Sequence, residues 1–246
     1  MASSLFNSVA GSYATTRPSY PPALYDAIAA AVGKPYKDLT VLDVGAGTGI
    51  ATEAMVARGA TVIAVDPARE MLAQLHDAVP GVEIICGDGN ALPVEDAFAD
   101  LVTYAQALHW TVPEQSVPEA MRALRPNGVL AAWWNVPDFG VEWVAAQAQR
   151  LRRAAPKYHG FVGTDIGGRL AEPPFNLNTE HHTFLWGREV TIGQHVTMLG
   201  TQSYLAALGP GPRAAFLQVE SEYLTQLFPH HVVNERYVTR LTIARR

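Results

Sequence analysis

The chain of 246 residues has one cysteine, Cys86, so it cannot form an internal disulfide. No run approaches the roughly 18 consecutive apolar residues that a membrane-spanning helix needs. The first residues also lack the basic start and apolar core of a secretory signal. These absences predict a cytoplasmic protein that has no membrane partner, with Cys86 as a small, buried apolar residue.

Positive charge is also scarce. Lys and Arg number 18 against 23 Asp and Glu, which gives a net charge of −5. A broad basic face for a phosphate backbone is therefore not expected, and neither is a nucleic-acid partner. A local basic run, Arg150, Arg152 and Arg153, is interpreted as a solvated helix face, with attraction of an acidic substrate as the alternative. Hydrophobic residues make up 48% of the chain, as in a globular protein.

Short apolar runs alternate with helical patterns in the first half. Strands are expected over Thr40–Val44, Thr61–Val65, Val82–Cys86, Leu101–Ala105 and Val129–Trp134, and helices over Ile50–Arg58, Pro67–Ala78 and Glu114–Leu124. Strands joined through helices pair in parallel with right-handed crossovers. The pattern predicts an α/β fold, a doubly wound, Rossmann-like, mostly parallel seven-stranded sheet with helices on both faces. Its ligand site is expected beyond the carboxyl ends of the strands.

The second half has a different pattern. We expect a helical and loop-rich lid over Phe139–Pro174, strands over His182–Trp186 and Val232–Ile243, and helices over Thr191–Leu208 and Arg213–Phe228 separated by Gly209–Pro212. No linker isolates a second domain. Residues 1–246 are therefore interpreted as one domain, with an N-terminal helical flap (1–38), a cofactor-binding core (39–135), a lid with substrate-side helices (136–230) and a last strand (231–246).

The strongest motif follows the first expected strand, in Val41-Leu-Asp-Val-Gly-Ala-Gly-Thr-Gly49. Glycines allow a sharp turn and let a ligand lie against the backbone. The N–H groups at the start of the next helix favour a polar or anionic ligand end. Alone this motif is a weak signal, because many nucleotide-binding loops resemble it.

Two acids sharpen the prediction. Asp43 directly precedes the glycine loop, where a carboxylate would repel a pyrophosphate but attract an ammonium group. Asp66 ends the second strand, where an acid can accept both hydroxyls of a ribose. The spacing is Gly-x-Gly-x-Gly and not the Gly-x-Gly-x-x-Gly of a dinucleotide loop. An amine, a ribose diol and no phosphate are the groups that S-adenosylmethionine offers.

Two further segments follow later strands. In Gly87-Asp-Gly-Asn90, the Asp88 carboxylate is placed to accept a hydrogen bond from an adenine amino group. The segment Thr103-Tyr-Ala-Gln-Ala-Leu-His-Trp110 follows the fourth strand and is expected to face the reactive end of the cofactor.

In order and spacing these segments resemble the class I S-adenosylmethionine-dependent methyltransferase family. Phe6-Asn7, the stretch Tyr13 to Tyr25 and Ala107-Leu-His-Trp110 resemble its trans-aconitate methyltransferase-like branch. The resemblance covers residues 5–135 well and the tail weakly. The tail lacks the length of the longer members, so their acid substrate is not carried over.

The resemblance implies a role for each matching segment. Residues 43–49 and 106–107 would border the methionine moiety, residues 66–71 the ribose and residues 87–90 the adenine, under a flap formed near residues 13–17. The implied cofactor contacts are Tyr13, Arg17, Asp43, Gly45, Ala46, Gly47, Thr48, Gly49, Asp66, Pro67, Met71, Gly87, Asp88, Gly89, Asn90, Gln106 and Ala107. The acceptor is expected to contact Tyr20, His109, Trp110 and Trp134.

The predicted activity is methyl transfer from S-adenosylmethionine to a small organic molecule, and the resemblance implies a carboxylate or hydroxyl oxygen as the acceptor atom. His109 is the candidate base, since its unperturbed pKa suits neutral pH. No metal is expected, and the protein is taken as a monomer or homodimer. The alternatives are a cyclase on the same scaffold, an N- or C-methyltransferase, a nicotinamide-dependent oxidoreductase and a nucleic-acid methyltransferase.

Several site residues also have structural interpretations. His109 would then only pack on Trp110 or hydrogen-bond the cofactor, and Asp43 would hydrogen-bond the loop backbone. Asp66 would cap the helix that follows it. Asp88 would be an ordinary turn residue, and Arg17 a surface charge.

Overall fold

The computed structural model describes residues 17–158 and 166–246. Its seven-stranded sheet has the order β3-β2-β1-β4-β5-β7-β6. The pairs β1–β2, β1–β4, β2–β3 and β4–β5 are parallel, so the predicted mostly parallel α/β sheet is confirmed. The strands are β1 (Thr40–Val44), β2 (Thr61–Asp66), β3 (Glu83–Cys86), β4 (Ala99–Ala105), β5 (Leu124–Pro137), β6 (Asn178–Thr191) and β7 (Val232–Arg245).

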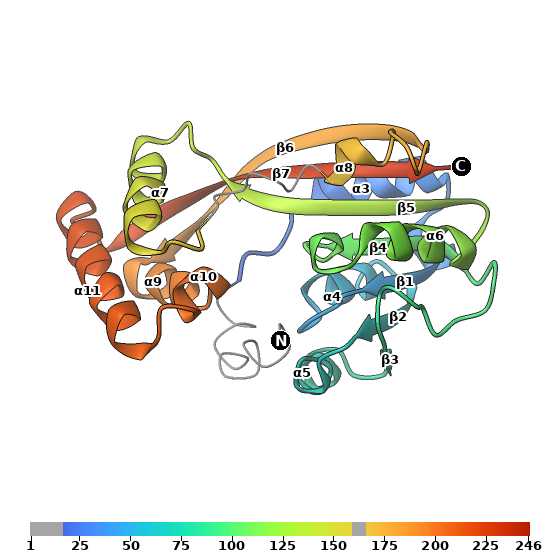
Figure 1. Ribbon diagram of the computed structural model, residues 1–246, viewed down its shortest axis with the longest axis horizontal. Helices are drawn as coiled ribbons and strands as arrows, with labels where there is room; N and C mark the ends of the chain where they lie inside the picture. Colours follow the sequence, from blue (N-terminus) through green and yellow to red (C-terminus); the bar gives the residue numbers. More distant parts are fainter. Residues whose placement is uncertain (1–16, 159–165) are drawn as a thin grey trace. The chain divides into compact units, whose positions relative to one another are not determined.

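Helices connect most of these strands (Figure 1). They are α3 (Pro22–Val32), η1 (Tyr36–Asp38), α4 (Ile50–Val56), α5 (Arg69–Ala78), η2 (Leu108–Trp110), α6 (Pro113–Ala123), α7 (Glu142–Ala154), α8 (Ile166–Arg169), α9 (Ile192–Gly200), α10 (Ser203–Ala206) and α11 (Pro210–Leu227). The expectation that Gly209–Pro212 separates two helices is wrong in detail. Helix α11 begins at Pro210, because a proline fits the first helical position, where its missing N–H is not needed.

The described residues fall into two compact units. The sheet unit holds residues 19–135, 166–184 and 239–246, and the helical unit holds residues 17–18, 136–158 and 185–238. The predicted core, residues 39–135, lies within the sheet unit. The predicted lid, residues 136–230, contributes to both units. The proposed single-domain organisation stays a prediction.

Helices cover both faces of the sheet unit. Helices α3 and α4 pack on the face that carries Val41, Leu101 and Trp133. Helix α6 lies on the opposite face, where the hydroxyl of Tyr104 donates to its Ser116 carbonyl at 3.3 Å. Because successive strand residues point to opposite faces, Trp133 faces the α3 side and Trp134 the α6 side. Adjacent residues of one strand therefore pack against helices on opposite faces of the sheet.

Strand β5 starts earlier than the predicted Val129. Ala99 of β4 pairs with Leu124, whereas Leu101 pairs with Val129, so the residues between form a bulge. Asn127 has a φ of +64° there. The Asn127-Gly128 pair therefore lies at an irregularity within the strand and not at its beginning.

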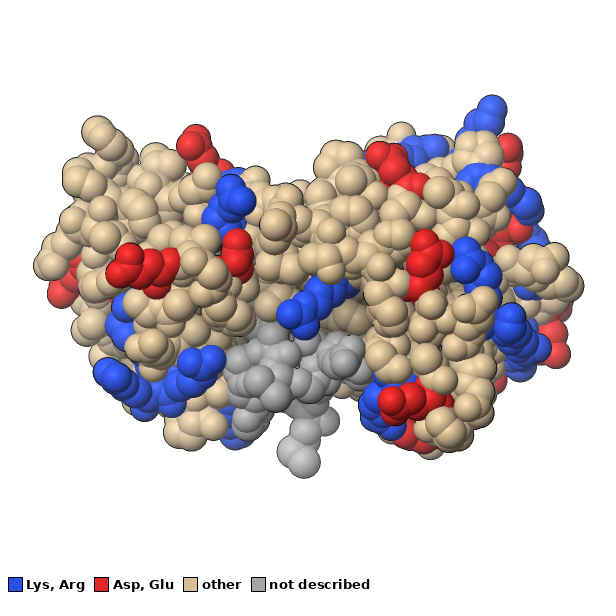
Figure 2. Space-filling view, turned by 90° about the horizontal axis from the view of Figure 1, so that it is seen from above, with Lys and Arg blue, Asp and Glu red and all other residues tan. Residues whose placement is uncertain are grey.

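The face shown in Figure 2 has mixed charge. Basic and acidic side chains are interspersed among the described residues seen from this side. Of the helices in residues 17–158 and 166–246, none combines the length and apolar character needed to cross a membrane.

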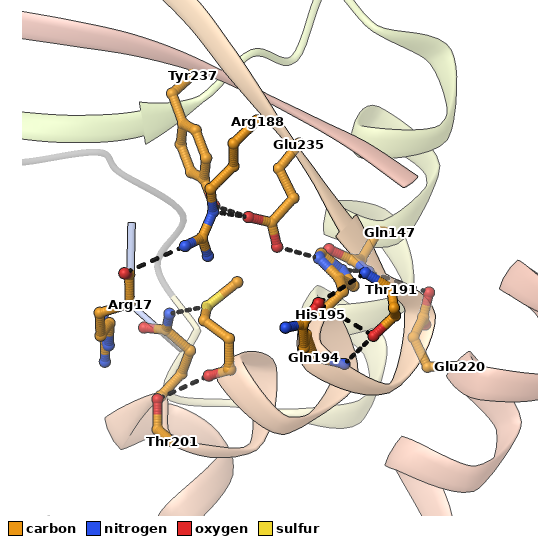
Figure 3. A network of polar contacts seen from close by, with 12 residues as sticks. Arg17, Gln147, Arg188, Thr191, Gln194, His195, Thr201, Glu220, Glu235 and Tyr237 are labelled. Carbon is orange, nitrogen blue, oxygen red and sulfur yellow. Dashed lines mark hydrogen bonds and ion pairs between the residues drawn. The ribbon is translucent and has the colours of Figure 1, made fainter. Parts of the chain in front are cut away.

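Buried polar contacts link the elements of the helical unit (Figure 3). The carboxylate of Glu235, which is 2% exposed, lies at their centre. It accepts hydrogen bonds from Arg188 Nε at 2.7 Å and from the Tyr237 hydroxyl at 2.9 Å, and it contacts His195 Nδ1 at 2.6 Å. Residues of β6, α9 and β7 are therefore held by one carboxylate.

A second carboxylate continues this network. Glu220 of α11 is fully buried and pairs with Arg150 of α7, whose Nε donates to Glu220 Oε2 at 2.9 Å. The side-chain amide of Gln147 lies between this pair and His195, 2.9 Å from His195 Nε2. Arg150 was predicted to belong to a solvated helix face; this is wrong, because its guanidinium neutralises a buried acid.

Candidate active site

The glycine loop begins where β1 ends, and each of its glycines meets a different constraint. Gly45, Gly47 and Gly49 have φ values of +70°, +58° and +90°. A Cβ on Gly45 would lie 2.5 Å from the Cβ of Ala107, and one on Gly49 would lie 2.8 Å from Leu75 Cγ. A Cβ on Gly47 would meet no atom within 4 Å. The two outer glycines permit close packing, whereas the loop at Gly47 faces open space.

Asp66 ties this loop to the end of β2. Its Oδ2 accepts the Gly47 N–H at 2.9 Å, and its Oδ1 accepts the Ala68 N–H at 2.8 Å. Desolvation raises the pKa of Asp66, and the two backbone N–H groups partly counter this rise. A carboxylate oxygen has two lone pairs, so both oxygens keep acceptor capacity for ribose hydroxyls. The bond to Ala68 at the start of α5 matches the helix-capping interpretation as well.

Asp43 is oriented differently from Asp66. Its side chain is fully buried, and its oxygens accept hydrogen bonds from the hydroxyls of Thr52 at 2.6 Å and Thr103 at 2.8 Å. Burial raises its pKa to about 6, and the charge of Asp66 acts in the same direction. The carboxylate thus connects β1 with α4 and β4. Its partners are two threonine hydroxyls and not the loop backbone, and its contact with a cofactor amine stays a prediction.

The segment after β3 forms a tight turn. Asp88 Oδ1 accepts both the backbone N–H and the side-chain amide of Asn90, each at 2.9 Å. Asn90 Oδ1 in turn accepts the Val112 N–H at 2.7 Å. A Cβ on Gly89 would lie 3.0 Å from Val44 Cγ1, so the turn approaches the end of β1 closely. The structure therefore shows the turn role of Asp88, and adenine binding by Gly87–Asn90 stays a prediction.

The chain turns sharply after β4. Gln106 has a φ of +54°, a conformation that non-glycine residues rarely adopt, and its N–H donates to the Trp133 carbonyl at 2.8 Å. Ala107 follows and packs on Gly45. Residues from β1, β2, β3 and β4 therefore meet at one edge of the sheet, as the sequence predicts.

His109 lies on η2, directly after this turn. The indole N–H of Trp134 donates to His109 Nδ1 at 3.1 Å, and the imidazole ring lies 4.8 Å from the indole of Trp110. Desolvation lowers the pKa of His109 to about 4, so the imidazole is neutral at pH 7. Trp134 is 3% exposed, whereas Trp110 is 55% exposed.

Four residues that were predicted to contact the cofactor or the acceptor have no described contact with the glycine loop. Tyr20 packs edge-on against Trp133, at 5.6 Å between ring centroids, in the core beneath α3. Met71 is buried, and the neighbouring Pro67 is exposed. Arg17 belongs to the helical unit. The roles of these four residues stay predictions, and Tyr13 lies outside the described residues.

Cys86 was expected to be buried, which is wrong. The thiol is exposed at the end of β3, where the segment leaves the sheet toward Gly87. An alternating or apolar run indicates a strand but does not show that every residue of a strand near the sheet edge is covered.

The residues around the glycine loop suit an adenosine better than a diphosphate. The hydroxyl of Thr48, in the loop, is buried and has no hydrogen-bond partner among the described residues, so a ligand group can supply one. Gly47 leaves space that a side chain would fill. The segments 41–49, 66–68 and 87–90 contain no Lys or Arg to neutralise phosphate. S-adenosylmethionine matches this set of groups.

Known proteins are similar to this chain in sequence and in fold. A methyltransferase domain family matches residues 42–132. An uncharacterized methyltransferase of Mycobacterium tuberculosis is 34% identical over 199 residues, which are 81% of this chain and 76% of the relative. A malonyl-[acyl-carrier protein] O-methyltransferase of Halorhodospira halophila is 31% identical over 66% of this chain and 58% of its own length.

A solved structure agrees with these relatives in fold. A protein from Anaeromyxobacter dehalogenans, provisionally assigned as a type II methyltransferase, superposes with a TM-score of 0.70 at 24% identity, covering 93% of this chain and 96% of its own. The sheet order, the glycine loop with its flanking acids and these relatives lead to one conclusion. The chain belongs to the class I S-adenosylmethionine-dependent methyltransferase family.

Proposed function

We propose that this enzyme methylates an oxygen of a small organic acceptor, and that the oxygen belongs to a carboxylate. The observation that carries the proposal is the surface next to the glycine loop: Ala107 touches Gly45, and the exposed indole of Trp110 follows three residues later beside His109. An apolar aromatic surface with a single polar group suits a small molecule. The name of the Halorhodospira halophila relative, an O-methyltransferase, supports oxygen as the methylated atom.

The residues of the site have limited chemistry to perform. When bound, S-adenosylmethionine supplies a methyl group that is already activated by its sulfonium. Gly45, Gly47 and Asp66 would hold the donor, and His109 with Trp110 would orient the acceptor. Alignment of the reacting atoms and exclusion of water then account for most of the rate gain.

Labelled cofactor tests the proposal. The enzyme is incubated with S-adenosylmethionine carrying a labelled methyl group and with benzoate, trans-aconitate and the matching alcohols and amines. We expect label in an acid product, and its loss after mild base, because esters hydrolyse under conditions that leave ethers and N-methyl groups intact. A base-stable product would contradict carboxyl methylation. Cofactor binding without label transfer to any acceptor would favour the cyclase alternative.

Calorimetry tests independently which cofactor the enzyme binds. We expect S-adenosylhomocysteine to bind and NAD to give no heat, because Asp66 lies beside the glycine loop and segments 41–49, 66–68 and 87–90 contain no Lys or Arg to neutralise a diphosphate. Binding of NAD alone would instead support an oxidoreductase.

Asp66→Ala is expected to weaken S-adenosylhomocysteine binding by about 1–3 kcal/mol, roughly 5- to 150-fold in Kd. The variant removes the acceptor for two ribose hydroxyls and also frees the Gly47 N–H. The matched control is Asp77→Ala, which removes an exposed acid from α5. Calorimetry measures both affinities, and thermal unfolding shows whether Asp66→Ala still folds. An unchanged Kd in a folded variant would remove Asp66 from the site.

A further inference from the structure

The contact between Trp134 and His109 fixes which nitrogen of the imidazole carries a proton. An indole N–H donates and never accepts a hydrogen bond. Its partner at 3.1 Å is His109 Nδ1, which must therefore be unprotonated. In a neutral imidazole one nitrogen carries hydrogen, so that hydrogen is on Nε2.

This tautomer has a consequence for proton transfer. The nitrogen of His109 with a free lone pair, Nδ1, faces the almost fully buried Trp134 and is occupied by its N–H. A proton from an acceptor hydroxyl could enter there only after the Trp134 contact broke. Nε2, the other nitrogen, already carries hydrogen and can only donate.

We propose that His109 is a fixed Nε2–H donor that binds an oxygen of the acceptor, and that the acceptor must reach the site already ionised, as a carboxylate. The inference rests on the proposed methyl transfer and replaces the role of base predicted for His109. Trp134 is then a positioning residue, because it acts only through His109.

A carboxylate satisfies both parts of this arrangement. One oxygen accepts the Nε2–H of His109 while the other forms the new bond to the methyl carbon. The carbon–sulfur bond breaks, sulfur keeps the electron pair, and no proton is released. An alcohol or ammonium group would have to lose a proton, and His109 offers no nitrogen to receive it. The indole of Trp110, beside His109, provides an apolar surface for the rest of the acceptor.

Nitrogen NMR on the protein alone tests the tautomer. The chain has eight histidines, so ¹⁵N-histidine spectra of the wild type and of His109→Gln identify the His109 signals by difference. We expect a protonated Nε2 and an unprotonated Nδ1 at pH 7. Trp134→Phe should let the ring sample both tautomers. The matched control, Trp133→Phe, removes a neighbouring indole whose N–H has no partner among the described residues, and should leave the spectrum unchanged.

Two substitutions test the donor role during catalysis. The amide N–H of glutamine takes a position close to that of Nε2–H but cannot accept a proton near neutral pH, whereas leucine provides no donor. With an acid acceptor we expect His109→Gln to retain kcat/KM within about tenfold and His109→Leu to lose about 10- to 100-fold, as for a lost hydrogen bond to a charged group. Equal losses in both variants would support a base and overturn the proposal.

The outcomes separate this inference from the proposed function. A protonated Nδ1, or averaged tautomers in the wild type, overturns the inference whatever the enzyme methylates. Methylation of an alcohol or amine overturns the carboxylate requirement while methyl transfer stands. Failure to bind S-adenosylhomocysteine counts against the proposed function and leaves the NMR result on His109 intact.

Discussion

The variant Gly45→Ala is expected to lose about 2–5 kcal/mol of unfolding free energy and its cofactor binding. Gly45 has a φ of +70°, and a left-handed conformation costs a residue with a Cβ roughly 1–2 kcal/mol. The new methyl would also lie 2.5 Å from the Cβ of Ala107, and overpacking typically costs about 1–3 kcal/mol. Urea unfolding and calorimetry with S-adenosylhomocysteine measure the two losses.

A second substitution separates the two causes. Combining Gly45→Ala with Ala107→Gly removes the Ala107 methyl that the new Cβ would otherwise meet. The double variant should therefore recover the stability lost to overpacking and retain the loss caused by the left-handed backbone. Gly81→Ala is the control, since Gly81 has a φ of +85° with no atom within 4 Å of a new Cβ. If the double variant is no more stable than Gly45→Ala, contact between the loop and Ala107 does not explain the glycine.

The variant Glu235→Ala is expected to lose about 3–5 kcal/mol, because it leaves Arg188 and His195 without their buried carboxylate partner. Tyr237 would lose its acceptor as well. Glu189→Ala removes an exposed acid from β6 and should change stability by no more than about 0.5 kcal/mol. Urea unfolding compares the two variants. Similar losses would mean that the network of Figure 3 contributes little to stability.

Acid should diminish the difference between wild type and Glu235→Gln. His195 and Arg188 lower the pKa of Glu235 despite its burial. A carboxyl whose pKa is lowered by folding stabilises the protein fully above the pKa of the unfolded chain, about 4.3 for glutamate. That contribution is lost as the pH falls through the lower native pKa. Stability measured from pH 7 down to pH 3 should therefore converge for the two proteins, and a gap that widens would contradict the direction of this shift.

Much of the sheet and its functional edge could be predicted because the relevant signals are local. Strands β1 to β4 are short β-rich runs, and Asp43, Asp66 and Asp88 are placed by their distance from a strand end. The partners of these acids were less accessible. Thr103 lies opposite Asp43 in the sheet register, but that pairing follows from the adjacency of β1 and β4, which no motif encodes.

The same limit applies to His109. Its segment was predicted to face the reaction, yet the role of base followed from residue type alone. The partner that fixes its tautomer, Trp134, comes from another strand, 25 residues later. Which of two adjacent tryptophans faces η2 depends on strand phase, and a bulge sets that phase between Leu124 and Val129. Tertiary pairing thus decides chemistry that composition leaves open.

The helical unit shows a related gap. Arg150 and Glu220 are separated by 70 residues, and neither sits in a recognisable motif. A charged residue in a helical pattern is normally solvated, so its burial becomes visible only when the facing helix is known.

The exposed thiol at the end of β3 makes this enzyme convenient to study. Cys86 is unique in the chain and lies one residue before the Gly87–Asn90 turn. A maleimide dye would therefore attach at a single defined position without any engineering of the sequence. Its emission would follow ligand arrival beside this turn in real time, including for acceptors that are never turned over.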